Sequence, residues 1–497
     1  MVYTPEEAPV GSPAPFHDAS ASGWELLYHH DCTFKPDTFD RVMLNLIRNP
    51  NINSSWLFRA DILHDSEAPD DAPSGLQSEG GDVKIISHDI TDVTLKRTLV
   101  RRLIPRNTSR DAPLDQTCTF YRAESEDSNV RSLVLYFPHT DTPNDMPFYH
   151  PKVQAIAHYH EWDPAAETGR ISISFLPYSG PGAPSLTEKK LRRVAYHLLE
   201  VVHKHGHSTE QGYVKRVHHD VLVPQSRVQN RYQKLKDTYA KALCTTWAES
   251  TDPTKHVFED LAITAFLIEL WADMYKDQDF PGFVDIGCGN GLLVYLLVKE
   301  GYRGWGFDAR GRKSWQQYDL PSPASPSRRA LEQRLLLPGI VPRPSASSDS
   351  QTLSADAIHD GTFPVGTFII SNHADELTPW TPILAALSQC PFIMIPCCSH
   401  KLTGEKFRPS PPRDKSKSSS TYASLVDWVT RIAEDCGWEV ETEMLRIPST
   451  RNTGLLGRRR AKGVSEDEIN AVVTAFGGVD GYYENVQKLV GSAPRAH

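Results

Sequence analysis

A glycine-rich turn at residues 285–291 is the part of the sequence best suited to hold a ligand. Its order is Asp-Ile-Gly-Cys-Gly-Asn-Gly, and it overlaps the apolar run Phe283 to Ile286, which is typical of a buried parallel strand. Because glycine lacks a Cβ atom, the backbone there can take positive φ and a ligand can lie against its N–H groups. The sequence then predicts a helix over 292–298 and a second strand over 304–307, closed by Asp308.

The spacing of the glycines distinguishes two classes of ligand. The dinucleotide fingerprint G-x-G-x-x-G would need a glycine at position 292, where the chain has Leu292. The form D-x-G-x-G-x-G instead resembles motif I of the S-adenosylmethionine-dependent methyltransferases with a Rossmann-like fold. Asp308, at the end of the next strand, would accept hydrogen bonds from ribose hydroxyls. The residues predicted to contact S-adenosyl-L-methionine are Asp285, Gly287, Cys288, Gly289, Asn290, Gly291, Asp308, Ala309 and Asn372.

Four expected strand ends carry polar residues, and ligands of an open α/β sheet bind outside the carboxyl ends of its strands. These ends are 285–291, 308–312, 372–376 and 397–400. Methyl transfer needs the acceptor held in line with the methyl group, and a hydroxyl acceptor also needs a base for its proton. The predicted catalytic residues are Asp375 as the base, His373 second, and Glu376. The alternative is that Asp375 and Glu376 cap the following helix.

Cys397 and Cys398, followed by His400, allow two further interpretations. Zinc would need additional ligands from Cys390 or His373, because adjacent cysteines do not easily ligate one ion, and no metal is predicted. A cysteine nucleophile could instead attack a pyrimidine ring, as methylation of a base carbon requires. Buried thiols that pack beneath the pocket are favoured over both.

Longer motifs carry a resemblance to one family. They are Asp285–Leu293, Gly306–Trp315, Asn372–Trp380, Pro396–Cys398 and Arg446–Asn452, with further matches at 255–260, 103–106 and 147–151. Together they resemble the eukaryotic tRNA (uracil-2′-O)-methyltransferases that modify uridine 44 of serine tRNA. The resemblance covers most of the chain from residue 100 to 460. It implies methylation of a ribose 2′-hydroxyl, and therefore a general base rather than a cysteine nucleophile.

Other functions stay open on the residues alone. The alternatives are a methyltransferase acting on a pyrimidine base, a protein or a small molecule, and a non-catalytic cofactor-binding scaffold associated with RNA. The expected partner is tRNA, most simply serine tRNA, and an accessory RNA-binding protein could be a further partner. No membrane or DNA partner is expected.

A basic stretch near the C-terminus is the predicted RNA surface. Six cations and no acid lie between residues 446 and 462, and each phosphate contact would steepen the salt dependence of RNA binding. The alternative is a solvated run of charge. The residues predicted to bind RNA are Arg310, Arg312, Lys313, Arg446, Arg451, Asn452, Arg458, Arg459 and Arg460.

Composition limits the class of protein. The chain has 497 residues, 39% of them hydrophobic and 23% charged, so two or three globular domains are expected. Its net charge of −9 excludes a global basic field. The eight cysteines follow no disulfide pattern, and neither a signal segment nor an apolar run long enough to span a membrane is found. A cytoplasmic location is expected.

The expected fold class is α/β, with a Rossmann-like S-adenosylmethionine methyltransferase sheet preceded by an α+β N-terminal domain. The predicted parts are a disordered leader at 1–22, the N-terminal domain at 23–206, which could bind tRNA, a helical connector at 207–250, the methyltransferase domain at 251–463, and a C-terminal helical extension at 464–497. Within the methyltransferase domain, 319–366 is an insertion that lacks a regular third strand, and 401–420 is a mobile basic loop in the position of a lid.

Local patterns in the N-terminal domain predict a largely antiparallel or mixed sheet closed by a helix at 187–205. Strands are expected at 83–86, 117–121, 132–137, 153–158 and 170–176, and a helical fragment at 331–337 in the later insertion. Two clusters of side chains in the N-terminal domain could bind a substrate or a metal. Arg97, Arg101, Arg102 and Arg106 could contact phosphates or form a solvated edge, and His139, His150, His158 and His160 are expected to be structural.

Overall fold

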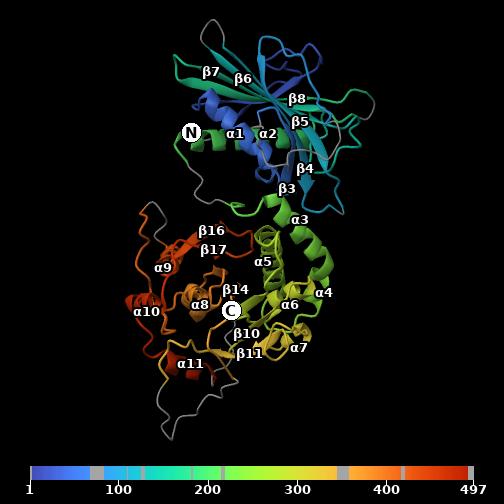
Figure 1. Cartoon of the computed structure of the whole chain (residues 1–497). Helices are drawn as coiled ribbons and strands as arrows, with labels where there is room; N and C mark the ends of the chain where they lie inside the picture. The colour runs from blue at the N-terminus through green and yellow to red at the C-terminus, as the bar shows by residue number, and fades with distance from the viewer. Residues whose placement is uncertain are drawn as a thin grey trace. The chain divides into compact units, whose positions relative to one another are not determined.

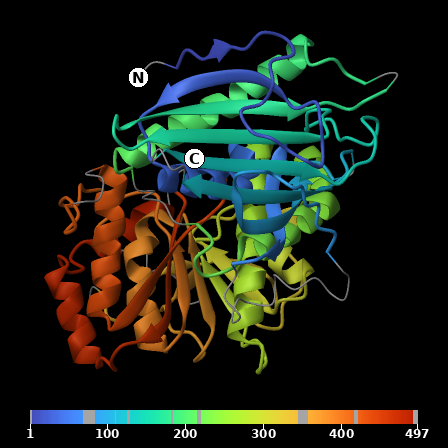
Figure 2. The same cartoon turned by 90° about the horizontal axis from the view of Figure 1, so that it is seen from above.

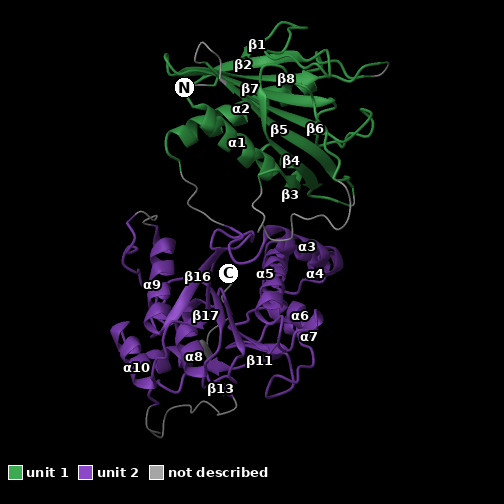
Figure 3. Cartoon of the chain, turned by 45° about the horizontal axis from the view of Figure 1, so that its top comes forward, with its two compact units in different colours: residues 1–215 green, residues 216–497 purple. Residues whose placement is uncertain are grey.

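The computed structural model describes residues 3–67, 83–108, 110–124, 129–180, 183–213, 219–343, 357–415 and 420–490. The chain divides into two compact units, Met1–Lys215 and Arg216–His497, shown in different colours in Figure 3. In the described parts, no helix is both long enough and apolar enough to cross a membrane.

The first unit is built on one antiparallel sheet. Its strand order is β1-β2-β8-β7-β6-β5-β4-β3, and α1 and α2 lie along one face of it (Figures 1 and 2). The elements are β1 Glu6–Glu7, β2 Glu25–Cys32, α1 Pro36–Arg48, η1 Pro50–Ile52, β3 Leu57–Asp65, β4 Thr94–Pro105, β5 Leu114–Glu124, β6 Val130–Pro138, β7 Ala155–Asp163, β8 Thr168–Leu176 and α2 Lys189–Glu210. The predicted antiparallel sheet and closing helix are confirmed, although residues 83–86 form no strand.

The predicted disordered leader is wrong for residues 3–22, because Tyr3 packs against α2 and the residues around Phe16 pack on the other face of the sheet. β1 pairs with β2, and Phe16 lies against Trp24 with ring centroids 5.2 Å apart. The buried Asp18 carboxylate accepts a 2.9 Å hydrogen bond from Trp24 Nε1. The composition is rich in Pro, Ala and Ser, but a few apolar side chains in register with a sheet are enough to order it.

The arginine cluster of the first unit is bonded within that unit. Arg97 pairs with Asp65, and Arg102 with Asp115. Arg101 is buried and donates to the side chain of Gln116 and to the carbonyls of Leu46 and Ile47 in the last turn of α1, where the helix dipole favours a cation. These contacts favour internal pairing over phosphate binding, and the buried Arg101 is not part of the solvated edge that was the alternative.

The histidine cluster of the first unit also has a structural environment. Burial lowers the pKa of His150 to about 4, of His158 to about 3 and of His160 to about 4. They therefore stay neutral in the interior, as the structural interpretation predicted.

The second unit contains a seven-stranded sheet in the order β11-β10-β9-β14-β15-β17-β16. The strands are β9 Phe283–Ile286, β10 Gly304–Asp308, β11 Leu331–Gln333, β14 Phe368–Asn372, β15 Phe392–Ile395, β16 Trp438–Met444 and β17 Thr453–Arg460, and β12 Leu335–Leu336 pairs separately with β13 Ile358–His359. The first five strands of the order are parallel, whereas β17 is antiparallel to both of its neighbours. From β9 the chain adds β10 and β11 on one side and then returns to add β14 and β15 on the other side, so the direction of strand addition reverses between β9 and β14.

Helices cover both faces of this sheet (Figure 1). Phe283 packs on the α5 side and Val284 on the α8 side, as the alternation of a buried strand requires. One layer holds α3 Gln225–Leu235, η2 Lys236–Ala240, α4 Lys241–Thr245, α5 Pro253–Met274, α6 Leu292–Lys299 and α7 Trp315–Tyr318, and the other holds α8 Thr381–Ser388, α9 Thr421–Asp435, α10 Glu466–Ala475 and α11 Tyr482–Val490. The residues predicted as a connector thus belong mainly to the first of these layers.

One prediction between β10 and α9 is wrong. Residues 331–337 are not helical: Leu331 pairs with Gly306, so β11 is the third parallel strand. Pairing with β10 overrides the helical preference of a Leu-rich segment. The predicted basic loop is anchored at its start, since Leu402 is fully buried and its carbonyl accepts from Trp380 Nε1 at 3.1 Å. Residues 344–356 and 416–419 lie outside the described parts.

Candidate active site

The glycine turn between β9 and α6 takes left-handed backbone conformations. The φ angles of Gly287, Gly289 and Gly291 are 75°, 53° and 79°. A Cβ at Gly291 would lie 2.6 Å from Leu331 Cδ1, so this glycine lets β11 pack against the turn. A Cβ at Gly289 would meet no atom within 4 Å. Gly289 therefore leaves open space, as a backbone that supports a ligand must.

The segment after β10 holds this turn in place. The Asp308 carboxylate accepts 3.0 Å hydrogen bonds from Gly289 N and Arg310 N. Trp315 Nε1 donates to Gly289 O at 2.9 Å, and the Ser314 hydroxyl donates to Asn290 O at 2.7 Å. Both oxygens of Asp308 keep a lone pair for a ribose hydroxyl. The supporting role of Ser314 and Trp315 was missed, because nothing in the sequence near them indicates which carbonyls they reach.

Two cavities meet at the glycine turn. The smaller, about 140 Å³, is lined by Asp308, Ala309, Arg310 and Glu376, and the larger, about 440 Å³, by Asp285, Cys288, Asn290 and Asn372. Both are lined by Gly287, Gly289, Arg312, His373 and Asp375. The structure thus brings most of the predicted cofactor and catalytic residues together.

Other residues of the cavity walls were missed. Leu335, Leu336, Tyr482 and Val486 line the smaller cavity, and Tyr482 donates a 3.0 Å hydrogen bond to Leu336 O. Tyr482 and Val486 belong to α11, which was predicted only as part of a C-terminal helical extension. They lie far from the glycine turn in the sequence and form no motif with it.

The larger cavity contains acceptors that suit a cationic group. Asp285 is 2% exposed, and burial, followed by the neighbouring charges of Asp260 and Asp308, raises its pKa well above the ordinary range. Within the described residues, Asp285 Oδ1 and Asn372 Oδ1 are buried without a hydrogen-bond partner. A buried acceptor without a partner is costly. The ammonium group of S-adenosylmethionine carries the donors that these oxygens lack, so the residues present fit this cofactor.

The candidate catalytic residues follow β14. His373 and Asp375 have φ angles of 51° and 44°, which are unusual for residues with a Cβ atom and occur often at functional sites. The helix η4 (Asp375–Trp380) begins after Ala374 and has no side-chain cap. Neither Asp375 nor Glu376 occupies the N-cap position of this helix, which is Ala374. Glu376 lines only the smaller cavity.

The first turns of α5 complete the wall opposite β14. His373 Nε2 lies 2.9 Å from Glu259 Oε1, and Asn372 Nδ2 lies 3.5 Å from Asp260 Oδ1. Glu259 is 6% exposed, so it holds the histidine ring inside the cavity. A carboxylate beside one ring nitrogen fixes the orientation of a histidine.

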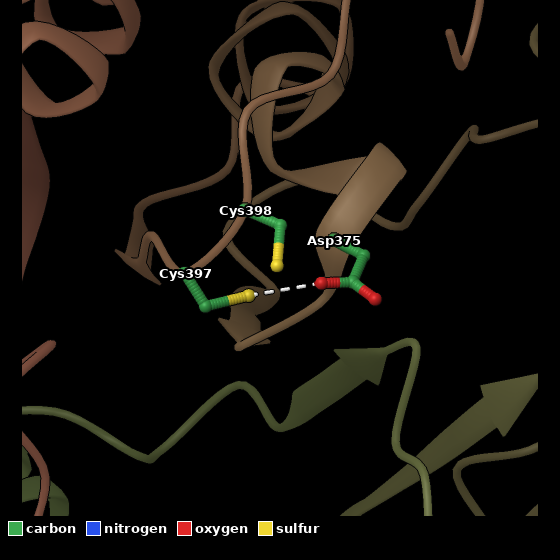
Figure 4. Close-up of side chains that lie close together, drawn as sticks. All are labelled: Asp375, Cys397 and Cys398. Carbon is green, nitrogen blue, oxygen red and sulfur yellow. Dashed lines mark hydrogen bonds between the residues drawn. The ribbon is translucent and has the colours of Figure 1, made fainter. Parts of the chain in front are cut away.

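Two thiols lie against the proposed base. Cys397 Sγ donates a 3.0 Å hydrogen bond to Asp375 Oδ1 (Figure 4). Burial, followed by the nearby Asp375 carboxylate, raises the pKa of the Cys397 thiol above its ordinary value, and the same two causes raise the pKa of Cys398. Because the thiolate is the reactive form, this environment disfavours a cysteine nucleophile.

The predicted RNA-binding residues do not form one surface. Arg312 and Arg451 line the larger cavity, and Lys313 is exposed outside both cavities. Arg446 pairs with Asp220, and the Asn452 amide donates to Leu445 O.

The arginines of β17 lie elsewhere. Because β17 is antiparallel to β15, its last residues lie beside the start of β15. The opposite end of the strands from Asn372 therefore carries Arg458, Arg459 and Arg460. Arg458 and Arg459 pair with acids of β16, and Arg460 lies over the Trp438 ring. The basic stretch is free of acids in the sequence, but its neighbouring strand supplies them.

Comparison with known proteins identifies the family. Residues 3–216 match the family model described as "TRM44-like, N-terminal bet v1-like domain", and residues 222–333 match "Predicted AdoMet-dependent methyltransferase". The first unit is thus bet v1-like, and the cofactor of the second is S-adenosylmethionine. A solved fragment of a STAR-related lipid transfer protein from Xanthomonas axonopodis shares 9% identity, covers 39% of this chain and 99% of its own, and has a TM-score of 0.22, too low to bear on the fold.

Three curated relatives, each named tRNA (uracil-O(2)-)-methyltransferase, match nearly the whole chain. The Neurospora crassa protein is 55% identical over 99% of this chain and 98% of its own length. The Schizosaccharomyces pombe protein is 38% identical over 98% of this chain and 96% of its own length. The Saccharomyces cerevisiae protein is 36% identical over 95% of this chain and 94% of its own length. The chain therefore belongs to the TRM44-like family of S-adenosylmethionine-dependent methyltransferases.

Proposed function

We propose that this chain methylates the 2′-hydroxyl of a uridine in tRNA, and specifically uridine 44 of serine tRNA. The relatives' name supports a uridine of tRNA as the target, and the family resemblance of the motifs supports the position. The observation that carries the proposal is the convergence of His373, Asp375 and the glycine turn on shared cavities. The reversal of chain order between β9 and β14 supports a Rossmann-like sheet with its ligand at that point.

The residues divide the chemistry among them. Bound S-adenosylmethionine supplies an electrophilic methyl group. Asp285 and Asn372 hold its amino group, and Asp375 removes the proton from the acceptor hydroxyl. His373, oriented by Glu259, is the second candidate for that base.

Cations of the larger cavity support an RNA substrate. Arg312 and Arg451 line it, and neither lies within 4.0 Å of a carboxylate oxygen in the described parts of the chain. Guanidinium groups without a carboxylate partner are suited to phosphate oxygens. We assign these two arginines to the phosphates that flank the target nucleotide. A cytoplasmic location is part of the same proposal, and the eight free cysteines are consistent with a reducing compartment.

Labelled cofactor and unmodified serine tRNA test the substrate. Nuclease digestion of the product should yield labelled 2′-O-methyluridine from position 44, and the same tRNA with 2′-deoxyuridine at that position should take up no label. Label in the uracil ring, or equal label in the deoxy substrate, would exclude ribose methylation.

Asp375→Asn tests the base. General-base catalysis contributes roughly 10²- to 10⁴-fold, so turnover should fall by that factor while cofactor affinity, measured by calorimetry, stays unchanged. Glu376→Gln is the matched control, because Glu376 lines only the smaller cavity. If Asp375→Asn keeps full turnover, His373 becomes the base.

A further inference from the structure

Asp375, Cys397 and Cys398 form a compact group of metal-type donors in the larger cavity. One carboxylate oxygen and the two Sγ atoms lie within 4.8 Å of one another. Figure 4 shows both sulfur atoms on the side of the Asp375 carboxylate. In the described parts of the chain, no second group of three His, Cys, Asp or Glu side chains meets this spacing. The three side chains come from two separate loops, so the group exists only in the folded chain.

Adjacent parallel strands bring the two loops together. Asn372 at the end of β14 is in register with Ile395 at the end of β15, so residues 375 and 397 leave the same edge of the sheet. Asp375 has a left-handed φ of 44°, and the backbone bends at Cys398. In an extended strand, consecutive side chains point to opposite faces. Because Cys397 and Cys398 lie beyond the strand, both sulfurs can face Asp375.

We propose that Asp375, Cys397 and Cys398 bind a thiophilic divalent cation, of which Zn²⁺ is the first candidate. Sulfur ligands select zinc and similar ions over Mg²⁺ and Ca²⁺, which prefer oxygen. Three protein ligands with one open position are typical of catalytic zinc sites. All three side chains line the 440 Å³ cavity, so a water molecule or an acceptor hydroxyl can reach the open position.

The charge around the group also suits a metal. Zn²⁺ with two thiolates and one carboxylate carries a net charge of −1, since the ion displaces the thiol protons. Arg451 Nη1 lies 3.8 Å from Cys398 Sγ, where its guanidinium can balance that charge. Arg451 is therefore a second-sphere partner of the same site.

This inference goes beyond the proposed function, because the metal site does not depend on which RNA is methylated. A carboxylate has two oxygens, so ligation through one leaves the other for the acceptor proton. Metal binding and methylation are measured separately, and either can fail without the other.

Cobalt is the direct probe of the site. Co²⁺ is added anaerobically to the full-length, metal-free chain, and the thiolate-to-cobalt charge-transfer absorption is followed. The expected result is saturation at one ion per chain. Cys397→Ser and Cys398→Ser should each weaken the band and the double variant should abolish it, while Cys244→Ser, a half-buried cysteine of α4, should leave it unchanged. Elemental analysis of the chain as purified should find zinc in the same proportion.

Two further measurements separate loss of the site from loss of the fold. Cofactor affinity by calorimetry should be retained in the double serine variant, which shows that the second unit is still folded. Arg451→Ala should weaken Co²⁺ binding by roughly 10- to 100-fold, the usual effect of losing a second-sphere contact. Absence of a charge-transfer band in the wild type, or an equal band in a folded double variant, would overturn the proposal.

Discussion

At the scale of single residues, the site depends on acids that the fold removes from water. Asp285 and Asp260 are both buried, and burial is the largest cause of the raised pKa of each. A raised pKa in the folded state means that the folded chain binds more protons than the unfolded chain above the ordinary carboxyl range, so the free energy of unfolding falls as pH rises there. The binding site is therefore formed at a cost in stability.

The substitution Asp285→Asn should separate the effect of this buried acid on the free energy of unfolding from its effect on cofactor binding. The free energy of unfolding of the cofactor-free variant should exceed that of the wild type at neutral pH, and its affinity for S-adenosylmethionine should be lower. In the wild type, an ammonium group beside Asp285 favours the carboxylate, so binding should release a proton and affinity should rise with pH. Calorimetry in buffers of different ionisation enthalpy measures this proton. A wild-type affinity that does not change with pH would contradict the assignment.

At the scale of elements, the turn between β9 and α6 has two functions that substitution can separate. Gly291→Ala adds a Cβ that would lie 2.6 Å from Leu331, in addition to a left-handed backbone. It should destabilise the chain by more than the roughly 1–2 kcal/mol of the backbone effect alone. Gly289→Ala meets open space and should show only the backbone effect, but its methyl group would occupy the ligand side of the turn. Denaturant unfolding and cofactor calorimetry distinguish them, and equal losses of stability would contradict this division.

Periodicity predicted the elements whose burial pattern is local. The helix expected over 292–298 is observed as α6, and β9 and β10 also lie where the apolar residues indicated. The segment at Leu331 was assigned wrongly, because a short apolar run fits either a helix or a strand. Only its partner β10, which is distant in the sequence, decides between them.

At the scale of the whole molecule, the position of the cations decides which of them can serve the active site. Arg451 lies in the larger cavity, whereas Arg458 lies at the opposite sheet edge and pairs with Glu441 at 2.6 Å. Arg451→Ala should weaken tRNA binding and reduce the slope of log affinity against log salt by about one phosphate contact. Arg458→Ala should leave the slope unchanged. Binding assays over a series of salt concentrations test both, and equal effects would place RNA on both edges of the sheet.

The first unit should be sensitive to acid. His158 is 3% exposed and its pKa is lowered to about 3, so the unfolded chain binds more protons from pH 6.5 downwards. The contribution of the neutral His158 to the free energy of unfolding is therefore complete above pH 6.5. It is lost as pH falls below 6.5, and the loss reaches about 2 kcal/mol at pH 5. His158→Leu should lose correspondingly less stability between pH 7.5 and pH 5. Hydrogen exchange of β7 in the full chain, corrected for intrinsic rates, measures the difference, and equal losses would exclude His158 as the cause.

The sequence by itself determined the cofactor, four of the five parallel strands and the residues at the ends of those four. Each of these follows from local properties, because a glycine turn, an apolar run and a terminal acid are adjacent in the chain. The family resemblance added the reaction and its substrate class.

Only the tertiary structure decided which side chains meet. Register between β14 and β15 brings Asp375 to two thiols, α5 brings Glu259 to His373, and the antiparallel β17 carries Arg458 away from the site. Strand neighbours and strand direction are properties of pairing between distant segments, and a linear spacing does not contain them. The same stretch of arginines can therefore serve a cavity at one end of a strand and stabilise a sheet at the other.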